Sequence, residues 1–247
     1  MKAAELFDLT GQVALVTGAS SGLGVRFAEV LAANGASVAL VARRAERLAA
    51  VKDRIGQNGG RAVAVSADVL DRAAMRRAFD AAEAAFGTVT VLVNNAGVTH
   101  ADRAIEIEET QWRRVLGTNL DAVLFWAQER GSIINVASIL GFGVDKGLIA
   151  YSVAKAGVVQ LTKALALELA FKGVRVNAIA PGYVVTEINR EFLAAKGAEI
   201  ARQIPAGRLG EERDLDGALL LLASGAGRFM AGATIVVDGG QMVGLRG

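Results

Sequence analysis

The sequence alternates short runs of β-branched and other apolar residues with amphipathic stretches, and this alternation restricts the fold more than any other feature. The apolar runs span residues 13–18, 37–43, 61–68, 89–97, 131–138, 173–182 and 232–240. Each of the first six precedes a helical pattern, such as the one over 23–35. Runs this apolar are typical of parallel strands that are covered by helices on both faces. We therefore predict an α/β, doubly wound Rossmann fold with a seven-stranded parallel sheet flanked by helices.

Composition favours one domain over 1–247, because no proline-rich or serine-rich linker divides the 247 residues. The 27 basic and 25 acidic residues nearly cancel, so neither a nucleic-acid partner nor a membrane surface is indicated. The chain has no cysteine and a single histidine, His100, so we expect no metal site and no serine–histidine triad. Neither a signal-peptide core nor a run of 18 apolar residues occurs, which predicts a cytoplasmic protein.

Ligands of a doubly wound sheet bind beyond the carboxyl ends of its strands, and the first of these ends is rich in glycine. The sequence "TGASSGLG" (17–24) carries Gly18, Gly22 and Gly24 and leads directly into a helical pattern. Glycine permits close approach of the backbone, and a helix N-terminus offers N–H groups to a pyrophosphate. The spacing G-x-x-x-G-x-G is neither the standard G-x-G-x-x-G nor a mononucleotide P-loop. Two interpretations remain, a dinucleotide site or only a tight turn.

The end of the second run concerns the choice of cofactor. Domains that select NAD usually place an acidic residue here, whereas this chain has Ala42, Arg43 and Arg44. A guanidinium can bind a 2′-phosphate through two parallel hydrogen bonds. We therefore predict NADP(H), with Arg43 as the main contact and Arg44 as support. The alternative is that both arginines simply open a solvated helix.

A tyrosine and a lysine four positions apart, Tyr151 and Lys155, should share one helix face. A nearby ammonium could lower the phenol pKa from about 10 to about 7–8, which suits a general acid or base. Ser138 ends the 131–138 run, where its hydroxyl could donate to the same substrate oxygen. Asn119 lies inside a helical pattern, an unfavourable place for asparagine unless its amide has a task. The alternative for Tyr151 and Lys155 is a surface pair with ordinary packing.

Seven motifs now stand in order at the expected strand ends. They are Thr17-Gly18-x-x-x-Gly22-x-Gly24, Asp68-Val69, Asn94-Asn95-Ala96-Gly97, Asn119, Ser138, Tyr151-x-x-x-Lys155 and Pro181-Gly182-x-Val184-x-Thr186. With them the chain resembles the classical short-chain dehydrogenase/reductase family over essentially its whole length, nearest to the 3-oxoacyl-acyl-carrier-protein reductase-like branch.

This resemblance implies a catalytic tetrad and a cofactor site. The tetrad is Asn119, Ser138, Tyr151 and Lys155, in which Asn119 holds a proton-relay water and Lys155 also binds the nicotinamide ribose. Thr186 would contact the carboxamide, and Asp68 would meet the adenine. The full set expected to bind the cofactor is Gly18, Ser20, Ser21, Gly22, Leu23, Gly24, Arg43, Arg44, Asp68, Val69, Asn95, Ala96, Gly97, Tyr151, Lys155, Pro181, Gly182, Val184 and Thr186.

The function implied is an NADPH-dependent carbonyl reductase, reversible as an alcohol dehydrogenase, that acts on a small ketone or secondary alcohol. Hydride would come from the nicotinamide and the proton from Tyr151. One alternative is a nucleotide-binding regulatory or scaffold protein that is catalytically silent, and another is an NAD-dependent alcohol dehydrogenase of the same fold. A methyltransferase-like Rossmann protein is disfavoured, because the acidic residue at the end of the second strand is missing.

Two further segments allow predictions about the substrate pocket and the assembly. Residues 183–210 resemble a substrate lid, whose Tyr183, Val185, Ile188, Phe192 and Leu193 could wall an apolar pocket together with Leu140, Phe142 and Val144, unless they are ordinary helix core. Only 18 residues separate Asn119 from Ser138, fewer than in familiar family members. Either this crossover is truncated or the sequence omits a segment. Its helix usually packs against a symmetry mate, so we expect a homo-oligomer, a tetramer or a dimer.

Overall fold

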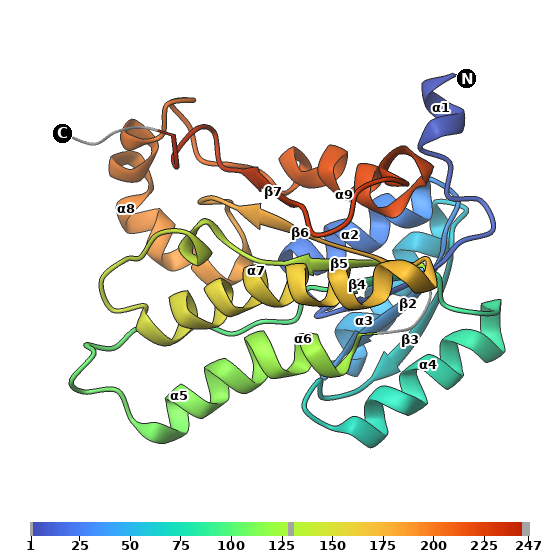
Figure 1. The fold of residues 1–247 in the computed structure, drawn as a ribbon, viewed down its shortest axis with the longest axis horizontal. Coiled ribbons are helices and arrows are strands. Elements are labelled where there is room, and N and C mark those ends of the chain that lie inside the picture. The colour runs from blue at the N-terminus through green and yellow to red at the C-terminus, as the bar shows by residue number, and fades with distance from the viewer. Residues whose placement is uncertain (1, 128–130, 244–247) are drawn as a thin grey trace.

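A seven-stranded sheet forms the centre of the computed structural model, which describes residues 2–127 and 131–243. All strand pairs are parallel, in the order β3-β2-β1-β4-β5-β6-β7 (Figure 1). The strands are β1 (Val13–Thr17), β2 (Ser37–Ala42), β3 (Arg61–Ser66), β4 (Val91–Asn94), β5 (Ser132–Val136), β6 (Arg175–Pro181) and β7 (Thr234–Val237). Each strand lies inside the apolar run that predicted it, so the predicted fold class is confirmed.

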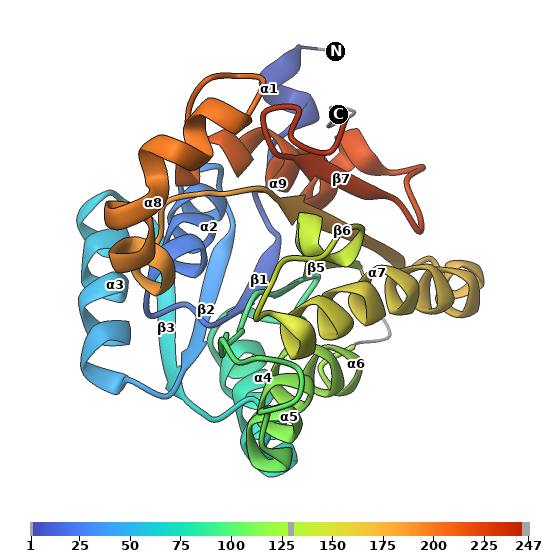
Figure 2. The same ribbon diagram turned by 90° about the vertical axis from the view of Figure 1, so that its left-hand side faces the viewer.

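Helices cover both faces of this sheet, because alternate side chains of each strand point to opposite sides. On β1, Ala14 and Val16 pack with α2, α3 and α9, whereas Val13 and Leu15 pack with α4, α6 and α7 (Figure 2). The helices are α1 (Ala3–Leu6), α2 (Gly22–Ala33), α3 (Ala45–Gln57), α4 (Arg72–Phe86), α5 (Glu109–Leu116), α6 (Ala122–Phe125), α7 (Ile149–Leu169), α8 (Arg190–Gln203) and α9 (Asp216–Ala223). In the described part of the chain, no helix combines the length and apolarity needed to span a bilayer.

The predicted crossover between Asn119 and Ser138 begins with a break in helical regularity. A π-helical turn (Gly117–Asp121) joins α5 to α6. After α6, the fully buried Trp126 donates from Nε1 to the carbonyl of Val69 at 3.0 Å, which fixes this end against the loop that follows β3. Residues 128–130, and with them part of the predicted short crossover, lie outside the described residues.

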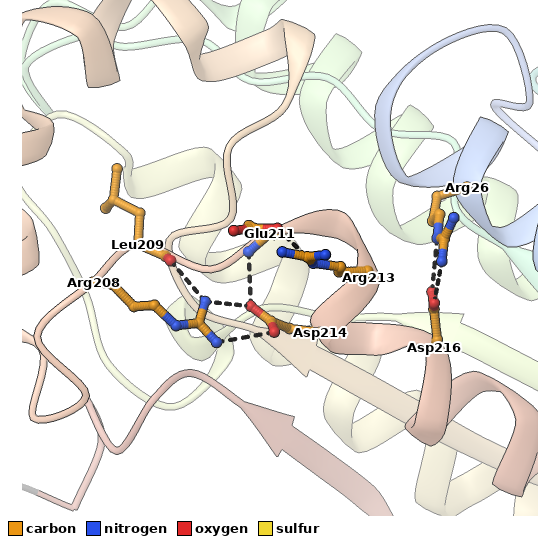
Figure 3. A network of polar contacts seen from close by, with 7 residues as sticks. All are labelled: Arg26, Arg208, Leu209, Glu211, Arg213, Asp214 and Asp216. Carbon is orange, nitrogen blue, oxygen red and sulfur yellow. Dashed lines mark hydrogen bonds and ion pairs between the residues drawn. The ribbon is translucent and has the colours of Figure 1, made fainter.

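The segment 183–210, predicted as a lid, leaves β6 and returns to its own starting point. Gly210 N donates to Tyr183 O at 2.9 Å, and Val185 N donates to Gly210 O at 3.0 Å. Figure 3 shows how the chain is fixed just beyond: Arg208 donates to both carboxylate oxygens of Asp214 at 2.6 and 3.0 Å. These contacts close the base of the segment. A short 3₁₀ helix (Glu187–Asn189) and α8 lie between its two ends.

A second ion pair in Figure 3 joins two helices on one face of the sheet. Arg26 of α2 forms a bidentate pair with the carboxylate of Asp216 at the start of α9. The negative charge of Asp216 also complements the positive, N-terminal end of the α9 dipole. The pair therefore helps to hold α9 beside the helix that follows the glycine-rich turn.

Candidate active site

A cavity of about 790 Å³ opens at the carboxyl edge of the sheet and brings together nearly all of the predicted residues. Because all seven strands are parallel, their carboxyl ends meet at this one edge. The predicted residues that line it are Gly18, Ser20, Ser21, Gly22, Leu23, Arg43, Arg44, Asp68, Val69, Asn95, Ala96, Gly97, Ser138, Tyr151, Lys155, Pro181, Gly182, Val184 and Thr186. Gly24 and Asn119 are not on its surface and support it from behind.

The glycine-rich turn is held tightly between β1 and β4. A Cβ built on Gly24 would lie 2.3 Å from the carbonyl oxygen of Gly18, so no larger residue fits there without moving the turn. Thr17 Oγ1 accepts from Asn95 N at 3.0 Å and from Ala96 N at 3.1 Å, which ties the turn to the end of β4. The Ser21 side chain does not cap α2. Ser21, Gly22 and Leu23 line the cavity, so this helix N-terminus, without a side-chain cap from Ser21, is suited to an anion.

Two arginines form a cationic border at the end of β2. Arg44 donates from Nε and Nη2 to Ser20 Oγ at 3.1 and 3.0 Å, and from Nη2 to Ser21 Oγ at 2.7 Å. The Arg43 side chain is 70% exposed, and its Nη1 lies 4.0 Å from the Asp68 carboxylate. Arg44 is thus already fixed beside the glycine-rich turn, whereas Arg43 has room to turn toward a ligand.

At the other end of the cavity, Tyr151 lies between Ser138 and Lys155. Ser138 lies close enough to Tyr151 for a side-chain hydrogen bond to influence the pKa of the phenol. Lys155 is 4% exposed, and its Nζ donates to the carbonyl of Val136 at 2.6 Å and lies 5.5 Å from the centre of the Tyr151 ring. The helix spacing that predicted this pair is therefore confirmed, together with the approach of Ser138.

The predicted direction of the Tyr151 pKa shift is wrong for the protein without ligand. Burial raises the pKa of the Tyr151 phenol, and the Ser138 hydrogen bond opposes this only in part. Burial also lowers the pKa of Lys155 to about 8. Both groups lose hydration, which favours their neutral forms, and the Lys155 ammonium is engaged by a backbone carbonyl. The phenol is consequently protonated near neutral pH.

Asn119 is fully buried in the π-helical turn, and its amide does have a task. Its Oδ1 accepts from Val98 N at 2.8 Å, and its Nδ2 donates to Val98 O at 2.7 Å. Both bonds fix the loop after β4, which forms one wall of the cavity. The Asn119 side chain therefore holds the loop after β4 in place.

The predicted apolar wall is confirmed for some residues and wrong for others. Leu140, Tyr183, Ile188 and Phe192 line the cavity, and the Tyr183 and Phe192 rings stack with centroids 6.5 Å apart. The others do not line it: Val144 is 86% exposed, Leu193 is buried in the lid, and Phe142 and Val185 lie away from the cavity surface. Apolarity alone cannot separate these outcomes, because each depends on which way the backbone turns.

Sequence reasoning missed seven polar residues of the cavity, and three of them, Asp145, Lys146 and Glu187, are charged residues within the predicted lid or within the loop before Tyr151. Asp145 accepts a hydrogen bond from the Tyr183 hydroxyl at 2.9 Å, so it joins the 139–148 loop to the 183–210 segment. Asp145 and Lys146 are the charged residues of an otherwise uncharged segment between Ser138 and Tyr151, a signal that could have identified them. Glu187 directly follows Thr186, but no pattern in the sequence indicates its partners.

Comparison with known proteins supplies independent findings. A family model described as short chain dehydrogenase matches residues 12–197. The chain is 36% identical over 243 residues to a 3-oxoacyl-acyl-carrier-protein reductase of Escherichia coli K12, covering 95% of this chain and 98% of that protein. It is 40% identical over 256 residues to a galactitol 2-dehydrogenase (L-tagatose-forming) of Cereibacter sphaeroides, covering 96% and 98%.

Solved structures agree with this similarity. A putative 2-deoxy-D-gluconate 3-dehydrogenase from Agrobacterium tumefaciens, solved with bound NADP, superposes with a TM-score of 0.88 at 41% identity. The match covers 96% of this chain and 99% of that one.

Proposed function

The chain belongs to the short-chain dehydrogenase/reductase family and is an NAD(P)-dependent enzyme, and we propose that it reduces a ketone or 3-oxo group to a secondary alcohol, reversibly, with NADPH. One observation carries this proposal. A protonated phenol, Tyr151, lies beside Ser138 in the wall of the same cavity whose far end holds the glycine-rich turn and two arginines.

The residues at the cofactor end fit a dinucleotide phosphate. Gly22 has a φ of +52°, and the turn from Gly18 to Gly24 excludes side chains where a pyrophosphate would meet the start of α2. Arg43 and Arg44 would hold the 2′-phosphate, with Arg43 as the main contact and Arg44 as the support already set by Ser20. When bound, NADP(H) supplies or accepts the hydride. A putative dehydrogenase of similar structure has been solved with NADP, which supports the same choice here.

The remaining residues of the predicted set have roles along the cavity. Asp68 and Val69 would border the adenine, and Asn95, Ala96 and Gly97 would form the floor beneath the ribose. Lys155 would bind the nicotinamide ribose, and Thr186 the carboxamide. Pro181, Gly182 and Val184 end β6 and begin the lid, where they would form the opposite wall.

Tyr151 would donate its proton to the carbonyl oxygen, and Ser138 would hold that oxygen with a second hydrogen bond. Because burial raises the pKa of Tyr151, the phenol carries its proton near neutral pH and is ready to act as an acid. In the reverse direction the same oxygen would accept the proton of an alcohol.

A panel of ketones tests the proposal. Because relatives are named for a 3-oxoacyl thioester reduction and for polyol oxidation, the panel should hold a 3-oxoacyl thioester, a ketose and a simple aliphatic ketone. We expect NADPH oxidation that depends on at least one of them. Binding of NADPH without consumption by any ketone would favour the silent binding protein, and faster turnover with NADH would favour the NAD-dependent alternative.

We also propose a homo-oligomer, a dimer or a tetramer. Helices α6 and α7 leave the apolar side chains of Leu124, Phe125, Ile149 and Val153 about 40% exposed, from 39% to 46%. A second copy of the chain would bury them. Sedimentation at micromolar concentration is expected to give a mass of at least two chains, and a monomer would contradict this assignment.

A further inference from the structure

One carboxylate joins the lid to the helix that follows the cationic border. Glu187 lies in the 183–210 segment, and its Oε1 and Oε2 both accept from Arg47 Nη1 of α3, at 2.6 and 2.7 Å. Arg44 Nη1 lies 3.6 Å from the same Oε1. The two partners are 140 positions apart in the sequence, so this contact exists only in the folded protein.

This contact lies across the cofactor end of the cavity. Glu187 and Arg44 both line it, on the lid side and on the α3 side. The residue before Glu187, Thr186, passes so close to the glycine-rich turn that a Cβ built on Gly22 would be 3.3 Å from Thr186 Cβ. The lid therefore covers the turn, and Glu187 extends this cover to α3.

The lid is closed at its base and held internally, and beyond these contacts it meets α3 through Glu187 and the 139–148 loop through Tyr183. The base is closed by the Tyr183–Gly210 hydrogen bond and by the Arg208–Asp214 pair. Within the lid, Asn189 Oδ1 accepts from Thr186 N at 2.9 Å, and its Nδ2 donates to Val184 O at 2.8 Å. Within residues 2–127 and 131–243, the ion pairs between 183–210 and 43–57 all use Glu187.

The charge and exposure of Glu187 and Arg47 suit an ion pair that can break and form again. The hydrogen bond from Arg47, and then the charges of Arg47, Arg44 and Arg190, lower the pKa of Glu187, so the carboxylate is ionised at neutral pH. Both side chains remain about half exposed, 49% for Arg47 and 45% for Glu187. Water can therefore replace the pair when the lid moves.

We propose that Glu187 and Arg47 form a latch over the cofactor end of the cavity and slow the dissociation of a bound dinucleotide. The ligand would leave only after this ion pair opens and the lid moves away from α3. This inference rests on the proposed function, because it takes a dinucleotide as the ligand beneath the lid.

The expected effect is modest, because exposed ion pairs contribute little. Loss of the latch should raise the dissociation rate constant by about two- to fivefold. Added salt should also raise the dissociation rate constant of the wild type, because it screens exposed charges. At high ionic strength the wild-type rate constant should therefore approach that of the variants.

The experiment measures dissociation of NADPH, and separately of NADH, by stopped-flow fluorescence. The proteins are wild type, Arg47→Gln, Glu187→Gln and the double variant. Arg54→Gln is the matched control, since Arg54 is on the same helix but pairs with Glu29 of α2 at 2.9 Å, and neither lines the cavity. NADH is needed because it lacks the 2′-phosphate, and a change near Arg44 could affect that phosphate directly.

A latch predicts that each single variant speeds the release of both dinucleotides, that the double variant is no faster than the singles, and that Arg54→Gln matches wild type. Unchanged rate constants, additive effects in the double variant, or acceleration confined to NADPH would overturn the latch while leaving the proposed function intact. Failure of the wild type to bind either dinucleotide would refute the proposed function, and the latch with it.

Discussion

At the carboxyl end of β2, single residues determine the proposed choice of cofactor. Arg43→Asp places there the acidic residue that NAD-binding domains usually carry. A carboxylate repels a 2′-phosphate, so the ratio of kcat/KM for NADPH over NADH should fall at least about tenfold, which is the scale of one charge-assisted contact. Arg76→Asp, an exposed position on α4, should leave the ratio unchanged. An Arg43→Asp enzyme with the wild-type ratio would contradict the assignment.

The buried ammonium of Lys155 gives a prediction about pH. Its pKa in the folded protein is about 8, below the ordinary value of 10.5, so the unfolded chain binds more protons between these values. Below pH 8 the buried Lys155 ammonium therefore lowers the free energy of unfolding by its full amount. This destabilisation disappears as the pH rises toward 10.5.

Comparison with Lys155→Met isolates this contribution, because other titrations cancel in the difference. Between about pH 8 and pH 10, the free energy of unfolding of wild type should rise by about 2 kcal/mol relative to Lys155→Met. Urea denaturation at the two pH values measures it. A difference that stays constant with pH would show that Lys155 titrates normally in the fold.

The site could be predicted from the sequence where it depends on local spacing, and not where it depends on burial. Tyr151 and Lys155 share a face because they are one helical turn apart, and Ser138 joins them because it ends a neighbouring strand. The raised pKa of Tyr151 depends on how much water the fold removes, which spacing does not report. Likewise, the contact of Glu187 with Arg47 depends on how the lid lies over α3.

At the scale of elements, the glycine-rich turn has no room for an added methyl group at Gly24. Gly24→Ala places a Cβ 2.3 Å from Gly18 O, and we expect a loss of about 1–3 kcal/mol in unfolding free energy together with weaker NADPH binding. Gly56→Ala is the matched control, because Gly56 lies in helix α3 and its Cβ would meet nothing within 4 Å.

Gly56→Ala should stabilise the protein by about 0.5–1 kcal/mol, since alanine restricts the unfolded chain and favours the helix. Urea denaturation compares the two variants, and NADPH fluorescence gives their affinities. Wild-type stability and affinity in Gly24→Ala would mean that the close contact with Gly18 does not restrict the turn.

The strands could be predicted because buried parallel strands consist almost entirely of apolar residues, as in "VALV" of β1, and end in glycine or polar residues. The π-helical turn at Asn119 could not be predicted, because the Asn119 side chain is held by two hydrogen bonds to Val98, 21 positions away, which local spacing does not report. The path of the backbone over residues 139–148 could not be predicted either. Apolar Val144 suggested a pocket wall, yet Asp145 turns inward to Tyr183.

At the scale of the whole molecule, one cavity joins two chemical functions that come from opposite halves of the sheet. β1, β2 and α2 supply the anion-binding end, whereas β5 and α7 supply Ser138, Tyr151 and Lys155. The proposed reaction requires both ends at once. Hydride must pass from the dinucleotide to a carbon whose oxygen is held by Tyr151.

Transfer of deuterium to the carbinol carbon of the product from NADPH that carries deuterium at both hydrogen positions of nicotinamide C4, followed by mass spectrometry, tests this most directly. We expect transfer by wild type with a ketone that it consumes, and transfer slower by about 10²–10⁴-fold in Tyr151→Phe with NADPH affinity retained. Tyr183→Phe removes the other tyrosine hydroxyl of the chain and should change KM far more than kcat. Unlabelled alcohol from wild type, or equal transfer rates in wild type and Tyr151→Phe, would contradict the proposed reaction.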